Sequence, residues 1–139
     1  MKVVLDTNVL VSGLLTPLGV CGGIVRMLTS DAMEPCVDSR ILFEYEQVLK
    51  RPRFRIDPDR ADALISYIEH ASQACGSTPL ARSLPDPDDD KFLEVAISAE
   101  ADCLVTGNSR HYPRDLRRGL RVLSPRAFVD KMVEPDLCS

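Results

Sequence analysis

Residues 89–108 read DDKFLEVAISAEADCLVTGN, and the two halves of this stretch have different hydrophobic patterns. From residue 89 to about residue 100 the apolar side chains lie on nearly all sides of a 3.6-residue repeat, which predicts a buried helix. Residues 103–106, CLVT, form a short apolar run that ends at a glycine and an asparagine, which predicts a buried strand. A helix that leads directly into a strand indicates an α/β fold.

The same alternation continues on both sides of this stretch. KVVL at residues 2–5 predicts a strand that ends at Asp6. We predict further helices over residues 19–28, 39–50 and 57 to about 76, further strands over 33–37 and 120–123, and a last helix that begins at Ser124 and Pro125. Parallel strands need connections that cross a face of the sheet, so we expect a three-layer α/β/α domain with a central, mainly parallel sheet.

Composition is typical of one globular domain. The chain has 139 residues, of which 45% are hydrophobic and 27% are charged. We find no internal repeat and no linker, so we expect one domain over residues 1–139 with a flexible C-terminal tail at about 134–139. No apolar run approaches the roughly 20 residues that cross a bilayer, so we expect a cytoplasmic protein without a membrane span.

The five cysteines do not have the spacing of a metal site. They are scattered, odd in number, and never arranged as C-x-x-C. His70 and His111 are the only histidines, and neither has a cysteine at the spacing of a zinc motif. We therefore expect thiols and no structural zinc.

Charge is segregated along the chain although the net charge is only −4. Residues 85–102 carry seven acidic side chains against Lys91 alone, whereas residues 110–126 carry six arginines against Asp115. Lys50, Arg51, Arg53 and Arg55 form a second basic group. This pattern suits an enzyme that holds a divalent cation and a polyanionic substrate, although solvated surfaces also carry charge runs.

Three acidic residues are candidates for a metal centre. Asp6 ends a buried strand, where a carboxylate needs a cation or several donors. Glu44 lies at the border of the apolar stripe of its helix, and Asp90 lies in the first turn of the buried helix. Ligands bind at the carboxyl ends of parallel strands, and carboxylates there suit Mg²⁺ or Mn²⁺. Taken singly, an Asx turn, a surface glutamate and a helix cap would explain the same residues.

Other phosphate and nucleophile chemistry lacks its motifs. The chain has no G-x-S-x-G, no G-x-x-x-x-G-K-[ST] and no G-x-G-x-x-G. An aspartyl-phosphate enzyme with a D-x-D opening is disfavoured because Asn8 stands two residues after Asp6.

Three segments together resemble PIN-domain ribonucleases, and in particular the VapC-like toxins of prokaryotic type II toxin-antitoxin systems. These segments are VVLDTNVLVSGLL at the N-terminus, SRILFEYEQVLKRPRF, and DPDDDKFLEVAISAEADCLVTGN, so the resemblance covers nearly the whole chain. It implies that Asp6, Glu44 and Asp90 are the metal-binding and catalytic acids. Many members have T-G-D where this chain has Thr106-Gly107-Asn108, and some have a later aspartate where it has His111.

The resemblance also implies supporting residues and a reaction. Asn8, Thr106 and Asn108 would support the metal ligands, and Ser12 is a weaker candidate for that role. Arg110, Arg114, Arg117 and Arg118 are candidates to grip the RNA backbone, because the few aromatic residues offer little stacking surface. The reaction implied is Mg²⁺- or Mn²⁺-dependent hydrolysis of an RNA phosphodiester, giving a 5′-phosphate and a 3′-hydroxyl. A cognate antitoxin and a homodimer are the implied protein partners.

Two alternatives remain open. The first is a catalytically weak or inactive PIN-fold module that binds RNA or protein, because Asn108 supplies no negative charge in place of the fourth acid. The second is a receiver-like phosphoacceptor domain, but it needs a phosphorylatable aspartate and a later strand-end lysine, and neither has a clear candidate in the sequence.

Overall fold

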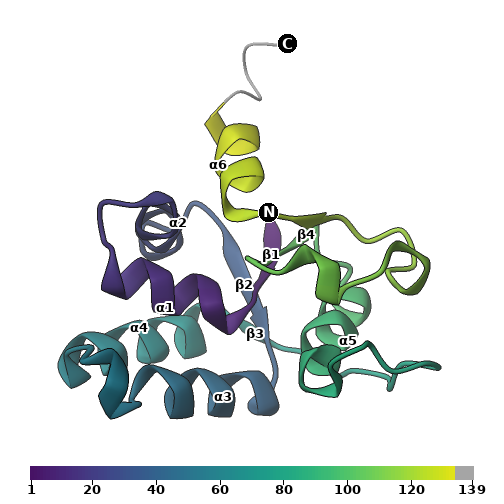
Figure 1. The fold of residues 1–139 in the computed structure, drawn as a ribbon, viewed down its shortest axis with the longest axis horizontal. Helices are drawn as coiled ribbons and strands as arrows, with labels where there is room; N and C mark the ends of the chain where they lie inside the picture. The colour runs from purple at the N-terminus through teal and green to yellow at the C-terminus, as the bar shows by residue number, and fades with distance from the viewer. Residues whose placement is uncertain (134–139) are drawn as a thin grey trace.

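A computed structural model describes residues 1–133 of the chain, so the expected tail at 134–139 lies outside the described residues. The centre is a five-stranded sheet in the order β3-β2-β1-β4-β5, and every pairing is parallel (Figure 1). The strands are β1 (Lys2–Leu5), β2 (Glu34–Val37), β3 (Gln73–Ala74), β4 (Cys103–Val105) and β5 (Val122–Leu123). The helices are α1 (Thr7–Leu15), α2 (Val20–Thr29), α3 (Ser39–Leu49), α4 (Pro58–Ala71), α5 (Asp90–Ser98) and α6 (Pro125–Val133).

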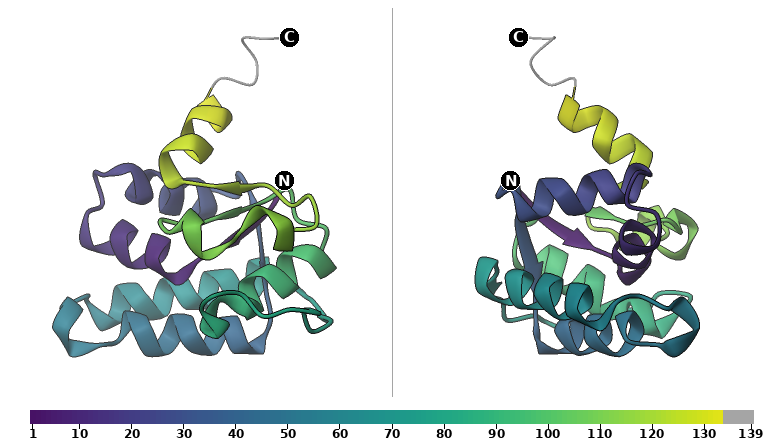
Figure 2. Two further views of the ribbon diagram at one scale, coloured as in Figure 1. Left: turned by 45° about the vertical axis from the view of Figure 1, so that its right-hand side comes forward. Right: turned by 90° about the vertical axis from the view of Figure 1, so that its left-hand side faces the viewer.

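Helices cover both faces of this sheet, which confirms the expected α/β/α fold class. In Figure 1, α1, α2 and α4 lie on one side of the strands and α5 lies on the other side. Both views of Figure 2 show α3 and α4 side by side, and the two helices are in contact. Helix α6 packs against α2, and Phe128 anchors it in the core. The layers follow from parallel connections that cross a face of the sheet.

The predicted elements agree with the structure except between residues 71 and 76, and helix α1 (Thr7–Leu15) was not predicted. We expected one helix from residue 57 to about 76, but α4 ends at Ala71 because Ser72 has extended backbone angles. Residues 73 and 74 then pair with β2 and form the edge strand β3. A two-residue strand has too short a pattern to be recognised in the sequence.

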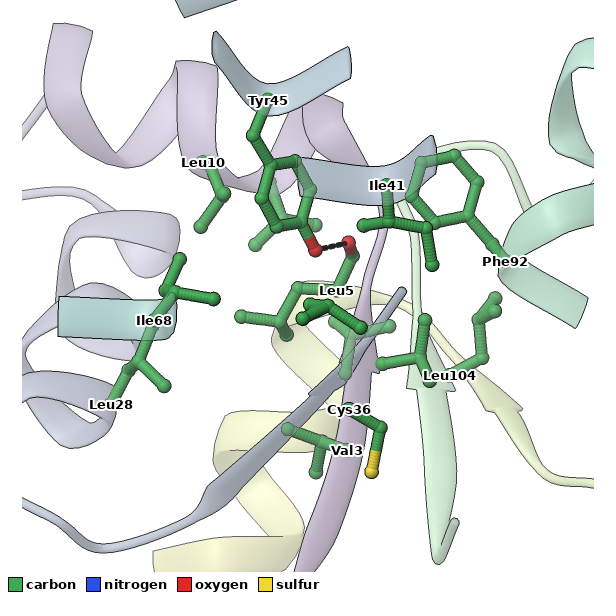
Figure 3. Packing of buried hydrophobic residues seen from close by; sticks show 14 of the residues in the cluster. Val3, Leu5, Leu10, Leu28, Cys36, Ile41, Tyr45, Ile68, Phe92 and Leu104 are labelled. Carbon is green, nitrogen blue, oxygen red and sulfur yellow. Dashed lines mark hydrogen bonds between the residues drawn. The ribbon is translucent and has the colours of Figure 1, made fainter. Parts of the chain in front are cut away.

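The core connects the first strand to the third helix by one buried hydrogen bond. The hydroxyl of Tyr45 on α3 donates to the carbonyl oxygen of Leu5 on β1 at 2.5 Å, and both residues are buried (Figure 3). Leu5 precedes Asp6, and Tyr45 follows Glu44. This hydrogen bond therefore fixes the distance between the two elements that carry these acids.

Helices α1 and α2 pack closely against each other at the N-terminal end of the domain. Within residues 1–133, no single helix has the length and apolar character needed to cross a membrane. Among these residues, only α1 and α2 taken together have that length and apolar character, and the two helices meet at a bend of 103°.

Candidate metal centre

Three carboxylates come together from three separate elements at the carboxyl ends of the central strands. Asp6 follows β1, Glu44 lies on α3, and Asp89 ends the short 3-10 helix η2 (Pro87–Asp89) directly before α5. Asp6 and Asp89 are only 6% and 9% exposed. Both occupy the N-cap position of a helix, yet neither side chain makes an N-cap hydrogen bond. Capping of α5 therefore does not explain the burial of Asp89.

Asp6 is held by two hydroxyl groups that reach the same oxygen. Thr106 donates to Oδ2 at 2.9 Å, and Tyr112 donates to it at 3.1 Å. Burial raises the pKa of Asp6, and the charge of Glu44 raises it further, whereas the two hydroxyl donors lower it. The arrangement thus keeps a buried carboxylate in one orientation, and no cationic side chain among residues 1–133 forms a salt bridge with it.

Glu44 has one hydroxyl donor and one cationic partner. The hydroxyl of Thr7 donates to Oε2 of Glu44, and the ammonium group of Lys91 lies 2.7 Å from Oε1. The same ammonium group donates to the carbonyl oxygen of Asp88. Lys91 therefore places a positive charge at the border of the acidic centre.

Asp89 has the clearest electrostatic signature of the three acids. Burial, followed by the charges of Asp6 and Asp86, raises its pKa to about 6, and the contact with His111 opposes this shift. Nδ1 of His111 lies 3.2 Å from Oδ2 of Asp89. Each residue of the group Asp86, Asp89 and His111 offers one ligand atom, and these three atoms lie within 4.8 Å of one another. Such repulsion among carboxylates is relieved when a cation binds.

Asp90, the third acid that the sequence analysis selected, lies next to this group but has other partners. Its Oδ1 accepts the backbone N–H of Leu84 at 2.8 Å, and its Oδ2 accepts the hydroxyl of Ser83 at 2.8 Å. Asp90 therefore closes the loop that precedes α5. The charge of Asp6 raises the pKa of the preceding residue, Asp89. Asp90 as a metal ligand stays a prediction.

The predicted supporting residues divide into two groups. Thr106 contacts Asp6 directly, and its hydroxyl accepts the backbone N–H of Asn108 at 3.0 Å. The side chain of Asn8 accepts the backbone N–H of Gly107 at 3.1 Å and so joins the ends of β1 and β4. Ser12 lies on the exposed side of α1, where its side chain contacts Cys21. Only Ser12 lacks a described contact with the acids or with the loops that carry them.

The four predicted RNA-binding arginines also differ in their surroundings. Arg110, Arg114 and Arg118 are exposed. Arg117 donates to the carbonyl oxygens of Tyr112 at 2.6 Å and Ser109 at 3.4 Å, so it fixes the loop that carries Tyr112. Its role in the structure is therefore at least partly to support that loop.

The site residues predicted from the sequence did not include five residues of this centre: Thr7, Asp89, Lys91, His111 and Tyr112. Tyr112 was considered only as a weak stacking surface, but it is fully buried and contacts Asp6. No periodic pattern surrounds Tyr112, because it follows a 3-10 turn over Ser109–His111. Lys91 did have a signal, since it is the single cation in the acidic stretch from residue 85 to 102.

The donor set fits a hard divalent cation. Mg²⁺ and Mn²⁺ prefer carboxylate oxygens and keep several water molecules, and the described residues gather carboxylates from β1, α3 and η2 at one edge. The imidazole of His111 adds a nitrogen donor, which Mn²⁺ accepts more readily than Mg²⁺. This edge, at the carboxyl ends of the parallel strands, is where open α/β sheets bind their ligands.

Comparisons with known proteins agree with the fold. The sequence model of the PIN domain matches residues 2–110. An uncharacterised protein of Methanocaldococcus jannaschii is 24% identical over 141 residues, covering 94% of this chain and 91% of the relative. Among solved structures, VapBC2 from Rickettsia felis, bound to a DNA fragment from its promoter, matches with a TM-score of 0.59 and 14% identity, over 89% of this chain and 98% of the matched chain.

The chain belongs to the PIN-domain family, as the resemblance in the sequence implied. The family match ends at Arg110, so His111 and Tyr112 contribute to the centre from beyond the matched segment.

Proposed function

We propose that this protein is a Mg²⁺- or Mn²⁺-dependent endoribonuclease, and that it is the toxin of a toxin-antitoxin pair. The observation that carries the proposal is the convergence of the buried Asp6 and Asp89 with the half-buried Glu44 in one acidic centre. Membership of the PIN-domain family supports nuclease chemistry. The likeness to a VapBC complex supports a cognate antitoxin as partner.

In this proposal Asp6, Glu44 and Asp89 hold the cation, and Asp90 is the alternative third ligand that the sequence predicts. A bound divalent cation supplies a water molecule of lowered pKa and neutralises charge that develops on the phosphate. Thr106 and Tyr112 orient Asp6 through Oδ2, which leaves Oδ1 free of both hydroxyls. Thr7 orients Glu44 in the same way.

Asn8, Thr106 and Asn108 keep the ends of β1 and β4 in register around Asp6. The proposed metal centre requires no fourth acid at residue 108, because His111 and Asp86 add donor atoms beside Asp89. Arg110, Arg114 and Arg118 are exposed cations that would contact phosphates. We further propose a homodimer in the cytoplasm, as the family resemblance implies.

The test is cleavage of a mixed pool of structured RNA by the purified protein with Mn²⁺, beside Asp6→Asn and a sample with EDTA. We expect wild type to cleave, and we expect the variant and the chelated sample to stay at background. The melting temperature of Asp6→Asn verifies that the variant is folded. Equal RNA decay from wild type and Asp6→Asn would contradict the proposal. RNA binding that persists in EDTA, without any cleavage in Mn²⁺, would favour a non-catalytic RNA-binding module instead.

A further inference from the structure

A groove of about 610 Å³ opens directly beside the acidic centre. One wall is the exposed side of α3, including Phe43, Gln47 and the following Arg51, and the other wall is formed by Asp88 and Lys91. Glu44 belongs to this lining and to the acidic centre as well. The groove therefore begins at a proposed metal ligand and leads away from it along α3.

Phe43 has an unusual position in this groove. Its side chain is 65% exposed, although most large hydrophobic residues of the domain are buried. Apart from Val48, the other lining residues are polar or charged, so Phe43 does not belong to an extended apolar patch. An isolated aromatic ring among polar groups is suited to stacking on a flat ligand, and every nucleobase offers such a face.

Phe43 and Gln47 are four residues apart on α3, so they lie on one side of the helix, about 6 Å apart along its axis. Arg51 follows two residues after the end of α3 and lines the same groove. The order from the acidic centre outward is an aromatic ring, a side-chain amide and a guanidinium group. An amide both donates to and accepts from the edge of a base, and a guanidinium group binds phosphate.

Positive charge continues beyond the groove. Arg51, Arg53 and Arg55 are exposed, and none of the three forms a salt bridge within residues 1–133. Lys50 differs, because it pairs with Glu46 and Asp62. The three arginines are thus available to an external anion, and their charge complements a nucleic-acid backbone.

We propose that this groove holds the single-stranded RNA next to the phosphate that is cleaved. Phe43 stacks on a base, Gln47 contacts a base edge, and Arg51, Arg53 and Arg55 bind the phosphates that follow. Phe43 and Gln47 would then determine which sequence lies at the cleavage site. This proposal rests on the proposed ribonuclease function and extends it to the path of the substrate.

The test measures binding of a fluorescent single-stranded RNA in EDTA to the Asp6→Asn protein, so that cleavage does not interfere. Adding Phe43→Ala should weaken binding about 10-fold, whereas Phe43→Trp should retain it. Adding Arg51→Gln and Arg53→Gln should make the dependence of log affinity on log salt shallower by about 0.7 per charge. Arg126→Gln on α6, another exposed arginine, serves as the control and should change neither value.

The outcomes separate this proposal from the proposed function. If wild type cleaves RNA, but Phe43→Ala leaves RNA binding by Asp6→Asn and cleavage by the otherwise wild-type protein within twofold, the groove proposal is wrong and the ribonuclease function stands. If Phe43→Ala instead changes the oligomeric mass and leaves RNA binding unchanged, the groove is a protein interface. If wild type neither cleaves RNA nor binds it, both proposals fail.

Discussion

The hydroxyl of Tyr112 lies 3.1 Å from Oδ2 of Asp6, although the two residues are 106 positions apart in the chain. Both residues are buried, and the charge of Asp6, after burial, raises the pKa of Tyr112, so Tyr112 remains a hydrogen-bond donor at neutral pH. The contact connects the loop after β4 to the end of β1. It makes Tyr112 a positioning residue for the proposed metal ligand.

Replacing Tyr112 with phenylalanine should therefore weaken Mn²⁺ binding by about 10-fold while the domain stays folded. The ring still fills its place in the core, but Oδ2 of Asp6 loses one of its two hydroxyl donors. Isothermal titration with Mn²⁺ measures the affinity. Tyr67→Phe is a matched control, because Tyr67 donates to Asp31 on the surface. Equal Mn²⁺ affinity of Tyr112→Phe and wild type would contradict the positioning role.

The raised pKa of Asp89 predicts a pH-dependent stability of the metal-free protein. Its folded-state pKa is about 6, above the usual 3.8, so the folded state binds this proton more tightly than the unfolded state. The favourable contribution of neutral Asp89 is complete below pH 3.8 and is lost as the pH rises through about 6. Above that range the charged, buried carboxylate costs the fold on the order of 3 kcal/mol.

Asp89→Asn removes that charge and should raise the melting temperature in EDTA at about pH 7.5 by several degrees. The difference from wild type should shrink as the pH falls through about 6 and should approach zero only near pH 3.8. Thermal melts of the two proteins across this range measure it. A difference that stays constant with pH would show that Asp89 is not destabilised by its charge.

Lys91 should act as a counter-charge for Glu44 when no metal is bound. In EDTA, Lys91→Met should lower the free energy of unfolding by on the order of 1 kcal/mol, because Glu44 then faces the charge of Asp6 without a cation. Mn²⁺ should restore that loss, so the rise in melting temperature on adding Mn²⁺ should exceed that of wild type. Lys50→Met, which removes an exposed pair with Asp62, should show no such difference. If adding Mn²⁺ raised the melting temperatures of Lys91→Met and Lys50→Met equally, Lys91 would not act as a counter-charge for Glu44.

Two neighbouring glycines of α2 should respond in opposite ways to alanine. A Cβ at Gly22 would lie 1.9 Å from the carbonyl oxygen of Pro17, so Gly22→Ala should destabilise the protein by about 3 kcal/mol. A Cβ at Gly23 would meet only the end of Arg26 at 3.7 Å, so Gly23→Ala should stabilise the helix by about 0.5–1 kcal/mol. Urea denaturation measures both values. A tolerated Gly22→Ala would mean that the loop before α2 packs differently.

The fold was largely predictable, because the alternation of apolar strands with amphipathic helices extends over most of the chain. Strand β3 was missed because its two residues carry no periodic signal, and its position depends on pairing with β2. The location of Asp6 and Glu44 at one edge of the sheet was predictable, because Asp6 ends a strand and Glu44 lies at the border of the apolar stripe of its helix. Their proximity depends on the hydrogen bond between Tyr45 and Leu5, which no local pattern encodes.

The third acid shows where sequence reasoning reaches its limit. Asp88, Asp89 and Asp90 are consecutive, and which of them faces Asp6 depends on where the helix begins. Pattern arguments locate a helix end only to within about two to four residues. The 3-10 turn over Pro87–Asp89 shifts that start so that Asp89 is buried, while Asp90 bonds to the loop at Leu84.

The central claim is tested most directly by comparing Asp89→Asn with Asp90→Asn for Mn²⁺ affinity and for RNA cleavage in the same assay. The account predicts that Asp89→Asn loses both, whereas Asp90→Asn retains both and is less stable because the contacts to Ser83 and Leu84 weaken. Loss of Mn²⁺ binding in Asp90→Asn, with Asp89→Asn still active, would contradict the metal centre derived from this structure.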